Sequence, residues 1–292
     1  MKTETVQGKK KIIKVGGAYH GWSDLHFVSY HPALTMAAGR HNAPRGLPDS
    51  TGMPQAFVDQ LIIQPFNDLE VIEKTIRERH FEIAAVLMEP ALANCGVIPP
   101  VEGYLEGLRK ITEQYGVLLI FDEVMTGFRI APGGAQEYYN IKPDISTFAK
   151  VLGGGFPAAC FGGTKEVMEI EAKNEVMHGG TYTASPLVLA AADAVLKRIE
   201  RDKETMYPRL FELSERLREG LVRVIREVGF HCFGQGIGPL FQVFIGDSDI
   251  DRLYNYRDTL GYVREDIFSA FHEELQKRGY PILSQSTLPM DE

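Results

Sequence analysis

Short apolar runs alternate with amphipathic stretches through the first half of the chain. Residues 68–80 and 101–115 have the periodicity of amphipathic helices, and Asp68 is a candidate N-cap for the first of them. The runs whose length and apolar character are typical of buried strands are residues 12–15, 84–89, 117–121, 145–149 and 158–162. This alternation predicts an α/β fold with a mostly parallel sheet and helices on both faces.

The pattern changes after Thr183. Two successive helices are predicted over residues 185–200 and 203–228, and a last helix over 263–279, closed by a C-cap glycine. Between them, residues 230–236 and 239–246 have the character of two strands. The C-terminal part therefore has an α+β pattern.

Two domains are predicted from this change of pattern. Residues 1–200 are predicted to form a large α/β domain, and residues 201–292 a small α+β domain. Inside the large domain, residues 31–55 are rich in Pro, Gly, His and Asn and are predicted to be an irregular excursion. A loop of that length in a compact domain is usually functional or disordered.

Composition excludes several classes of function. The chain has 292 residues, a formal net charge of −8 and no basic stripe, so no nucleic-acid partner is expected. The basic run of Lys9–Lys11 and Lys14 is interpreted as a solvated segment. No apolar run has the length of a membrane span. Three isolated cysteines without metal-ligand spacing indicate reduced thiols, and a cytoplasmic location is expected.

Lys150 and Asp122 each follow an apolar run, at the predicted carboxyl ends of two strands. Open α/β sheets bind ligands at that edge, and charged groups are rarely buried there without partners. Taken alone, Lys150 is interpretable as a surface lysine and Asp122 as a helix N-cap. Together they match what pyridoxal phosphate requires, namely a lysine that forms a Schiff base and an acid that pairs with the pyridinium nitrogen.

Five segments carry a resemblance to a known family. They are A-Y-H-G-W (18–22), M-E-P-A-L-A-N-C-G-V-I-P-P (88–100), L-L-I-F-D-E-V-M-T-G-F-R (118–129), K-P-D-I-S-T-F-A-K-V-L-G-G-G-F-P (142–157) and H-G-G-T-Y-T-A-S-P (178–186). The chain resembles the class III pyridoxal-phosphate-dependent aminotransferases from about residue 12 to about residue 245. The resemblance implies a type I (aspartate aminotransferase-like) fold. Within the family the segments are most similar to the glutamate-1-semialdehyde aminomutases.

The resemblance implies roles for individual residues. Lys150 would hold pyridoxal phosphate and move the substrate proton, and Asp122 would pair with the ring nitrogen. Tyr19 would stack on one face of the ring with Val124 beneath the other, and His20 would complete the turn. Without the motif, Tyr19 would be interpreted as a core aromatic. Thr181 would bind the cofactor phosphate of the partner subunit across a homodimer interface.

Three further residues are placed near the substrate by the resemblance. Glu89 and Asn94 would lie in a strand-end loop that approaches the substrate and the cofactor, although on local sequence Asn94 is equally typical of a turn. Met125 occupies a position where many class III aminotransferases carry Gln, whereas the aminomutases and some β-amino-acid aminotransferases carry Met. No metal site is predicted, because His26, His31 and His41 lack the spacing of metal ligands.

The expected reaction is conversion of glutamate 1-semialdehyde to 5-aminolevulinate. The chain departs from the family in beginning almost at the Tyr-His-Gly motif, without the phosphate-cradling turn, and in stopping before the family's final strand and helix. A shortened chain is therefore expected, with two alternatives left open. One is an aminotransferase acting on a β- or ω-amino acid with a keto-acid acceptor. The other is an inactive dimerisation or regulatory module.

Overall fold

A six-stranded sheet forms the centre of the molecule in this computed structural model, which describes residues 8–32 and 38–280. Its strand order is β4-β1-β5-β6-β7-β8. The strands are β1 (Lys11–Val15), β4 (Leu61–Gln64), β5 (Ile83–Met88), β6 (Leu118–Asp122), β7 (Ile145–Phe148) and β8 (Cys160–Gly163). Only β8 pairs antiparallel, with β7, so the predicted mostly parallel sheet is confirmed. The sequence pattern missed β4.

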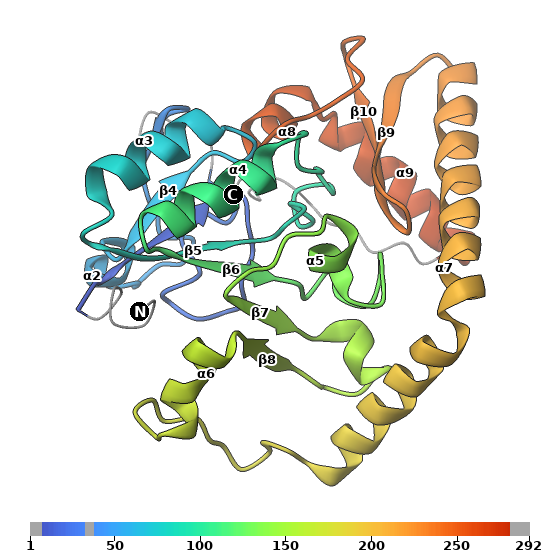
Figure 1. The fold of residues 1–292 in the computed structure, drawn as a ribbon. Coiled ribbons are helices and arrows are strands. Elements are labelled where there is room, and N and C mark those ends of the chain that lie inside the picture. The colour runs from blue at the N-terminus through green and yellow to red at the C-terminus, as the bar shows by residue number, and fades with distance from the viewer. Residues whose placement is uncertain (1–7, 33–37, 281–292) are drawn as a thin grey trace.

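Two amphipathic helices cover one face of the sheet (Figure 1). They are α3 (Leu69–Arg79) and α4 (Tyr104–Gln114). The predicted cap of α3 is confirmed, because the Asp68 carboxylate accepts from the Val71 backbone N–H at 3.1 Å. Ile72 and Ile76 lie one turn apart on α3 and are fully buried. Burial of each side chain stabilises the folded state by about 1.5–3 kcal/mol. They join a core shared by α4 and the sheet.

The opposite face is covered mainly by irregular chain rather than by long helices. The segment from residue 16 to residue 60 contains only α2 (Gln55–Val58) and the two-residue strands β2 (Gly39–Arg40) and β3 (Ala43–Pro44) among its described residues. Val28 and Val58 from this segment pack on Leu61 and Ile63 of β4. Farther along the face, Val167 of α6 (Lys165–Ala172) packs on Ala85 and Leu118. Met53, from the described part of the predicted irregular excursion, packs against the cluster that contains Leu61 and Ile63. Residues 33–37 of that excursion lie outside the described residues.

A single helix, α7 (Pro186–Glu227), replaces the two helices predicted over this region. It is 42 residues long and continues through Pro208 along one side of the molecule (Figure 1). The predicted domain boundary near residue 201 falls inside this helix and stays a prediction. None of the helices in the described ranges is long and apolar enough to cross a membrane.

The C-terminal part packs on the same core as the sheet. The two predicted strands are confirmed as β9 (His231–Ile237) and β10 (Leu240–Gly246), which pair as an antiparallel hairpin. They are followed by α8 (Tyr256–Tyr262) and by the predicted last helix, α9 (Glu265–Lys277). Phe233 and Phe244 of the hairpin stack at 5.3 Å and belong to the main core cluster. The helix α8 was not predicted. The short helix α5 (Gly134–Tyr138) lies between β6 and β7, and the 3-10 helix η2 (Lys150–Gly153) follows β7.

Candidate active site

Four neighbouring parallel strands end at one edge of the sheet, and each delivers a predicted site residue there. Tyr19 follows β1, Glu89 follows β5, and Asp122 ends β6. Lys150 begins η2, directly beyond β7. These residues line one open cavity of about 480 Å³, a size typical of small-molecule sites. The predicted crevice at the carboxyl ends of the strands is thus present in the structure.

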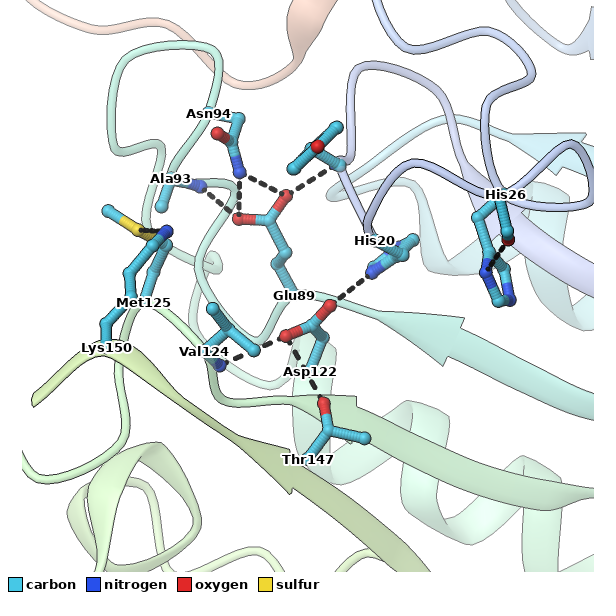
Figure 2. A network of polar contacts seen from close by, with 12 residues as sticks. His20, His26, Glu89, Ala93, Asn94, Asp122, Val124, Met125, Thr147 and Lys150 are labelled. Atoms are coloured by element: carbon cyan, nitrogen blue, oxygen red, sulfur yellow. Dashed lines mark hydrogen bonds and ion pairs between the residues drawn. The ribbon is translucent and has the colours of Figure 1, made fainter. Parts of the chain in front are cut away.

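Lys150 is held in an unusual backbone conformation. Its φ of 49° lies in the left-handed region, which costs a non-glycine residue about 1–3 kcal/mol. Its ammonium group lies 2.7 Å from the Met125 sulfur, directly beside it (Figure 2). Desolvation lowers the pKa of Lys150, while the Glu89 carboxylate acts in the opposite direction. A lowered pKa increases the fraction of free amine at neutral pH, as a nucleophilic lysine requires.

Asp122 is 7% exposed and has three hydrogen-bond partners. One carboxylate oxygen lies 2.7 Å from Nδ1 of His20, and the other accepts from the Val124 backbone N–H at 3.0 Å and the Thr147 hydroxyl at 3.3 Å. Desolvation lowers the pKa of His20, which favours the neutral imidazole. Because the carboxylate only accepts, Nδ1 of that imidazole carries the hydrogen. His20 therefore orients Asp122.

Glu89 fastens two segments of the site to each other. Its carboxylate accepts from the Tyr19 backbone N–H at 2.9 Å and from the Ala93 backbone N–H at 3.0 Å. The Asn94 side-chain amide adds contacts of 3.3 Å to both oxygens. Desolvation raises the pKa of Glu89 to about 7. Figure 2 shows Glu89 and Asp122 at the centre of this network, with Lys150 and His20 on opposite sides.

Glu123 immediately follows Asp122 but has a different place. It is fully buried and accepts from the Thr126 hydroxyl at 2.7 Å. The backbone N–H groups of Ala135 and Gln136, at the start of α5, donate to it at 2.6 and 2.9 Å. Glu123 therefore holds the 123–130 turn, which carries Val124 and Met125, against the start of α5.

The predicted residues do not all meet at the cavity. Tyr19, His20, Asn94, Val124 and Met125 line it with Lys150, Asp122 and Glu89. Thr181 is exposed in the turn before α7 and lies outside the lining. Its predicted role needs a second subunit and stays a prediction.

The sequence reasoning missed several residues at the site. Thr147 and His178 line the cavity, and Thr147 is the register partner of Asp122 in the β6–β7 pair. Only the pairing register could have revealed Thr147. The interpretation of Lys14 as solvated is wrong, because its side chain is completely buried at 0% exposure. Its position inside an apolar strand run was the available signal.

Residues 1–231 match the sequence profile described as Aminotransferase class-III. The chain belongs to this family. It is 39% identical over 265 residues to the glutamate-1-semialdehyde 2,1-aminomutase of Natranaerobius thermophilus, an alignment covering 87% of this chain and 59% of that protein. The chain thus spans somewhat more than half the length of the curated relatives it matches.

Two solved structures are similar to the fold of this chain. An omega-transaminase from Sphaerobacter thermophilus superposes with a TM-score of 0.84 at 33% identity, covering 95% of this chain and 63% of that chain. A glutamate-1-semialdehyde aminomutase from Pseudomonas aeruginosa, in complex with PMP, gives a TM-score of 0.76 at 26% identity, covering 95% of this chain and 60% of that chain. The type I fold expected from the sequence is therefore confirmed.

Proposed function

We propose that this chain carries the catalytic centre of a pyridoxal-phosphate-dependent enzyme that moves an amino group. The observation that carries the proposal is the placement of Lys150 and Asp122 on one cavity at the carboxyl ends of adjacent strands β6 and β7. A lysine amine and an oriented carboxylate are the two groups by which proteins hold the reactive end and the ring nitrogen of this cofactor.

The lining of the cavity fits the ring of pyridoxal phosphate. Asp122 would pair with the ring nitrogen, Lys150 would hold the aldehyde carbon, and Tyr19 and Val124 would face the ring, with His20 and Asn94 beside it. When bound, the cofactor supplies an electrophilic carbon and a ring that accepts electrons. Lys150 would then move a proton with its Nζ atom, and its lowered pKa, caused by desolvation, supports that role. For the phosphate we propose Thr181 of a second subunit.

The specific reaction we propose is conversion of glutamate 1-semialdehyde to 5-aminolevulinate. Met125 supports this substrate, because its sulfur borders Lys150 where many relatives in the family present an amide. Similarity to curated aminomutases over 87% of the chain supports it as well. Glu89 and Asn94 would border the substrate beside Met125.

The test is the colour and covalent chemistry of the purified chain. We expect a visible absorption band after incubation with pyridoxal phosphate, bleached by borohydride with a permanent label on Lys150. Lys150→Ala should give neither band nor label, whereas Lys142→Ala, at an exposed lysine, should behave as the wild type. A colourless wild-type chain that takes up no label would contradict the proposal and favour the inactive dimerisation or regulatory module.

A second candidate is an aminotransferase acting on a β- or ω-amino acid. The TM-score of 0.84 to an omega-transaminase favours it. The two reactions differ in their need for a second substrate. Multiple turnovers of glutamate semialdehyde without an added keto acid support aminomutation, whereas turnover that stops after one equivalent supports the aminotransferase.

A homodimer is part of the proposal. Thr181 lies in an exposed turn next to Tyr182 and Leu187, which are 88% and 64% exposed. Apolar side chains so exposed are typical of interaction surfaces. We propose that this turn meets a second copy of the chain and presents Thr181 to the partner's cofactor phosphate.

A further inference from the structure

Lys14 is a buried cation that the proposed chemistry does not use. It lies on β1 between β4 and β5, where its register partners are the apolar residues Ile63 and Leu87. Its side chain is fully buried, and Nζ donates to the Val28 carbonyl at 2.8 Å. An ammonium group at such a position is strongly disfavoured unless nearby charges compensate for the lost hydration.

Two carboxylates supply that compensation, and both bind backbone of the site. Asp49 and Glu89 each act on Lys14 through their charge. Asp49 accepts from the Tyr30 backbone N–H at 2.7 Å and from that of His31 at 3.2 Å. Glu89 accepts from the Tyr19 backbone N–H at 2.9 Å. The cation and the two acids therefore contact residues 19–31 at three places: Tyr19, Val28 and the Tyr30–His31 pair.

We propose that Lys14 is a positioning residue of the active site. Its buried ammonium group holds the Val28 carbonyl and offsets the charge of Asp49 and Glu89, whose carboxylates hold the backbone of Tyr30, His31 and Tyr19. Together these contacts fix residues 19–31 as the wall that carries Tyr19 and His20. The proposal rests on the proposed function for its relevance to the cofactor. Its effect on the wall is independent of any ligand.

The charges around Lys14 agree with this role. Asp49, Glu89 and Cys95 raise the pKa of Lys14, but desolvation outweighs them and lowers it to about 8. At pH 7 the group is therefore charged. Desolvation raises the pKa of Asp49 and of Cys95, and the charge of Lys14 acts against that rise. Desolvation lowers the pKa values of His20, His26 and His31, and the charge of Lys14 lowers them further. Its strand neighbours Ile63 and Leu87 add no charge.

Amide hydrogen exchange of the full chain tests the proposal without a ligand. The variant is Lys14→Met, which keeps the length of the side chain and removes the charge, and the matched control is Lys10→Met, at an exposed lysine. At pH 7 we expect the protection factors of Tyr19, Tyr30 and His31 to fall about tenfold in Lys14→Met, because the carboxylates that accept from them are left buried without a compensating cation. Lys10→Met should leave them unchanged.

Two features separate this role from general loss of packing. The protection lost in Lys14→Met should return in part at Tyr30 and His31 when Asp49→Asn is added, because the compensating charge is then removed as well. The loss should also lessen as the pH is lowered from 8 to 6, because the two carboxyls take up protons and the uncompensated buried charge disappears. Unchanged protection factors in folded Lys14→Met, or a loss that neither depends on pH nor is relieved by Asp49→Asn, would overturn the proposal.

A titration covers the case in which Lys14→Met does not fold. In protein labelled with carbon-13 at the lysine ε-carbons, one lysine should titrate near pH 8, and its midpoint should move down in Asp49→Asn. A midpoint that does not move would overturn the proposal. Binding of pyridoxal phosphate by Lys14→Met separates the two ideas. Wild type that binds no cofactor rejects the proposed function alone, whereas equal affinity of wild type and variant rejects the positioning role.

Discussion

At the scale of single residues, the site depends on ionisable groups whose surroundings change their protonation. Lys150, His20 and Glu89 all have pKa values shifted first of all by desolvation, each toward its neutral form. Such shifts concentrate at functional sites. The sequence identified all three residues, but burial and hydrogen bonding decided what each can do.

Lys150 is needed for covalent attachment and proton transfer, and its backbone is strained. We expect Lys150→Ala to lower turnover by about a thousandfold, the range of a lost general acid–base group. Lys150→Gly should be equally inactive yet more stable than Lys150→Ala by about 1 kcal/mol, because glycine accepts a positive φ. Steady-state kinetics and denaturant unfolding measure the two effects. Equal stability of the two variants would argue against strain at this position.

Glu89 makes stability depend on pH in a defined direction. Its pKa is raised from 4.5 in the unfolded chain to about 7 in the folded protein, so the folded state holds more protons between these values. The stabilising contribution of protonated Glu89 is therefore lost as pH rises through that window, by up to about 3 kcal/mol. Urea unfolding of wild type relative to Glu89→Gln should show this trend. The same comparison of the wild type with Glu78→Gln, a substitution on the exposed side of α3, should show no such pH dependence.

At the scale of elements, turns rather than strands set the geometry of the site. The strand β1 ends at Val15 and is followed by a turn at Gly16 and Gly17, after which Tyr19 and His20 lie at the cavity. Gly17 has a φ of +87°, and a Cβ atom there would lie 2.6 Å from Cβ of Tyr256 on α8. The turn is therefore tied both to a left-handed conformation and to the close approach of a C-terminal helix.

Gly17→Ala tests that approach. We expect it to destabilise the protein by about 2–4 kcal/mol, since backbone strain adds to overpacking against Tyr256. Gly52→Ala is the matched control, because Gly52 has a φ of +85° with nothing within 4 Å of its Cβ position. It should lose only about 1 kcal/mol from strain. Thermal or denaturant unfolding gives both values, and equal losses would show that Tyr256 moves aside.

At the scale of the whole molecule, the sheet core and the C-terminal hairpin share one set of buried side chains. The first part of α7 and the turn before it instead expose apolar residues, including Leu187 and Leu189 at 64% and 54%. This is the surface on which the proposed homodimer depends.

We expect Leu187→Asp with Leu189→Asp to shift the chain from dimer to monomer and to weaken binding of pyridoxal phosphate. The reason is that a buried unpaired carboxylate strongly disfavours an interface. Leu217→Asp is the control, because Leu217 is 55% exposed and lies about 40 Å farther along the helix. Sedimentation over a range of protein concentrations measures the association. A wild-type chain that stays monomeric at all of them would reject the dimer.

The sequence by itself determined the class of fold and the main chemical groups. Alternating apolar runs predicted the parallel sheet, and the motifs around Asp122 and Lys150 predicted the residues at its edge. Local periodicity could not separate one long helix from two, because α7 has the same pattern on both sides of residue 201. Nor could it find β4, a four-residue strand recognisable only by its pairing with β1.

Tertiary structure alone decided which charges are buried. Lys14 and Lys10 are similar in sequence, yet one is enclosed between β1 and the segment containing Val28 while the other faces solvent. Asp122 and Glu123 are adjacent, yet one faces the cavity and the other fastens α5. Burial depends on contacts between distant segments, so the local pattern could only hint at it for Lys14 and did not distinguish Asp122 from Glu123. Desolvation by those contacts then shifts the pKa values on which the proposed chemistry depends.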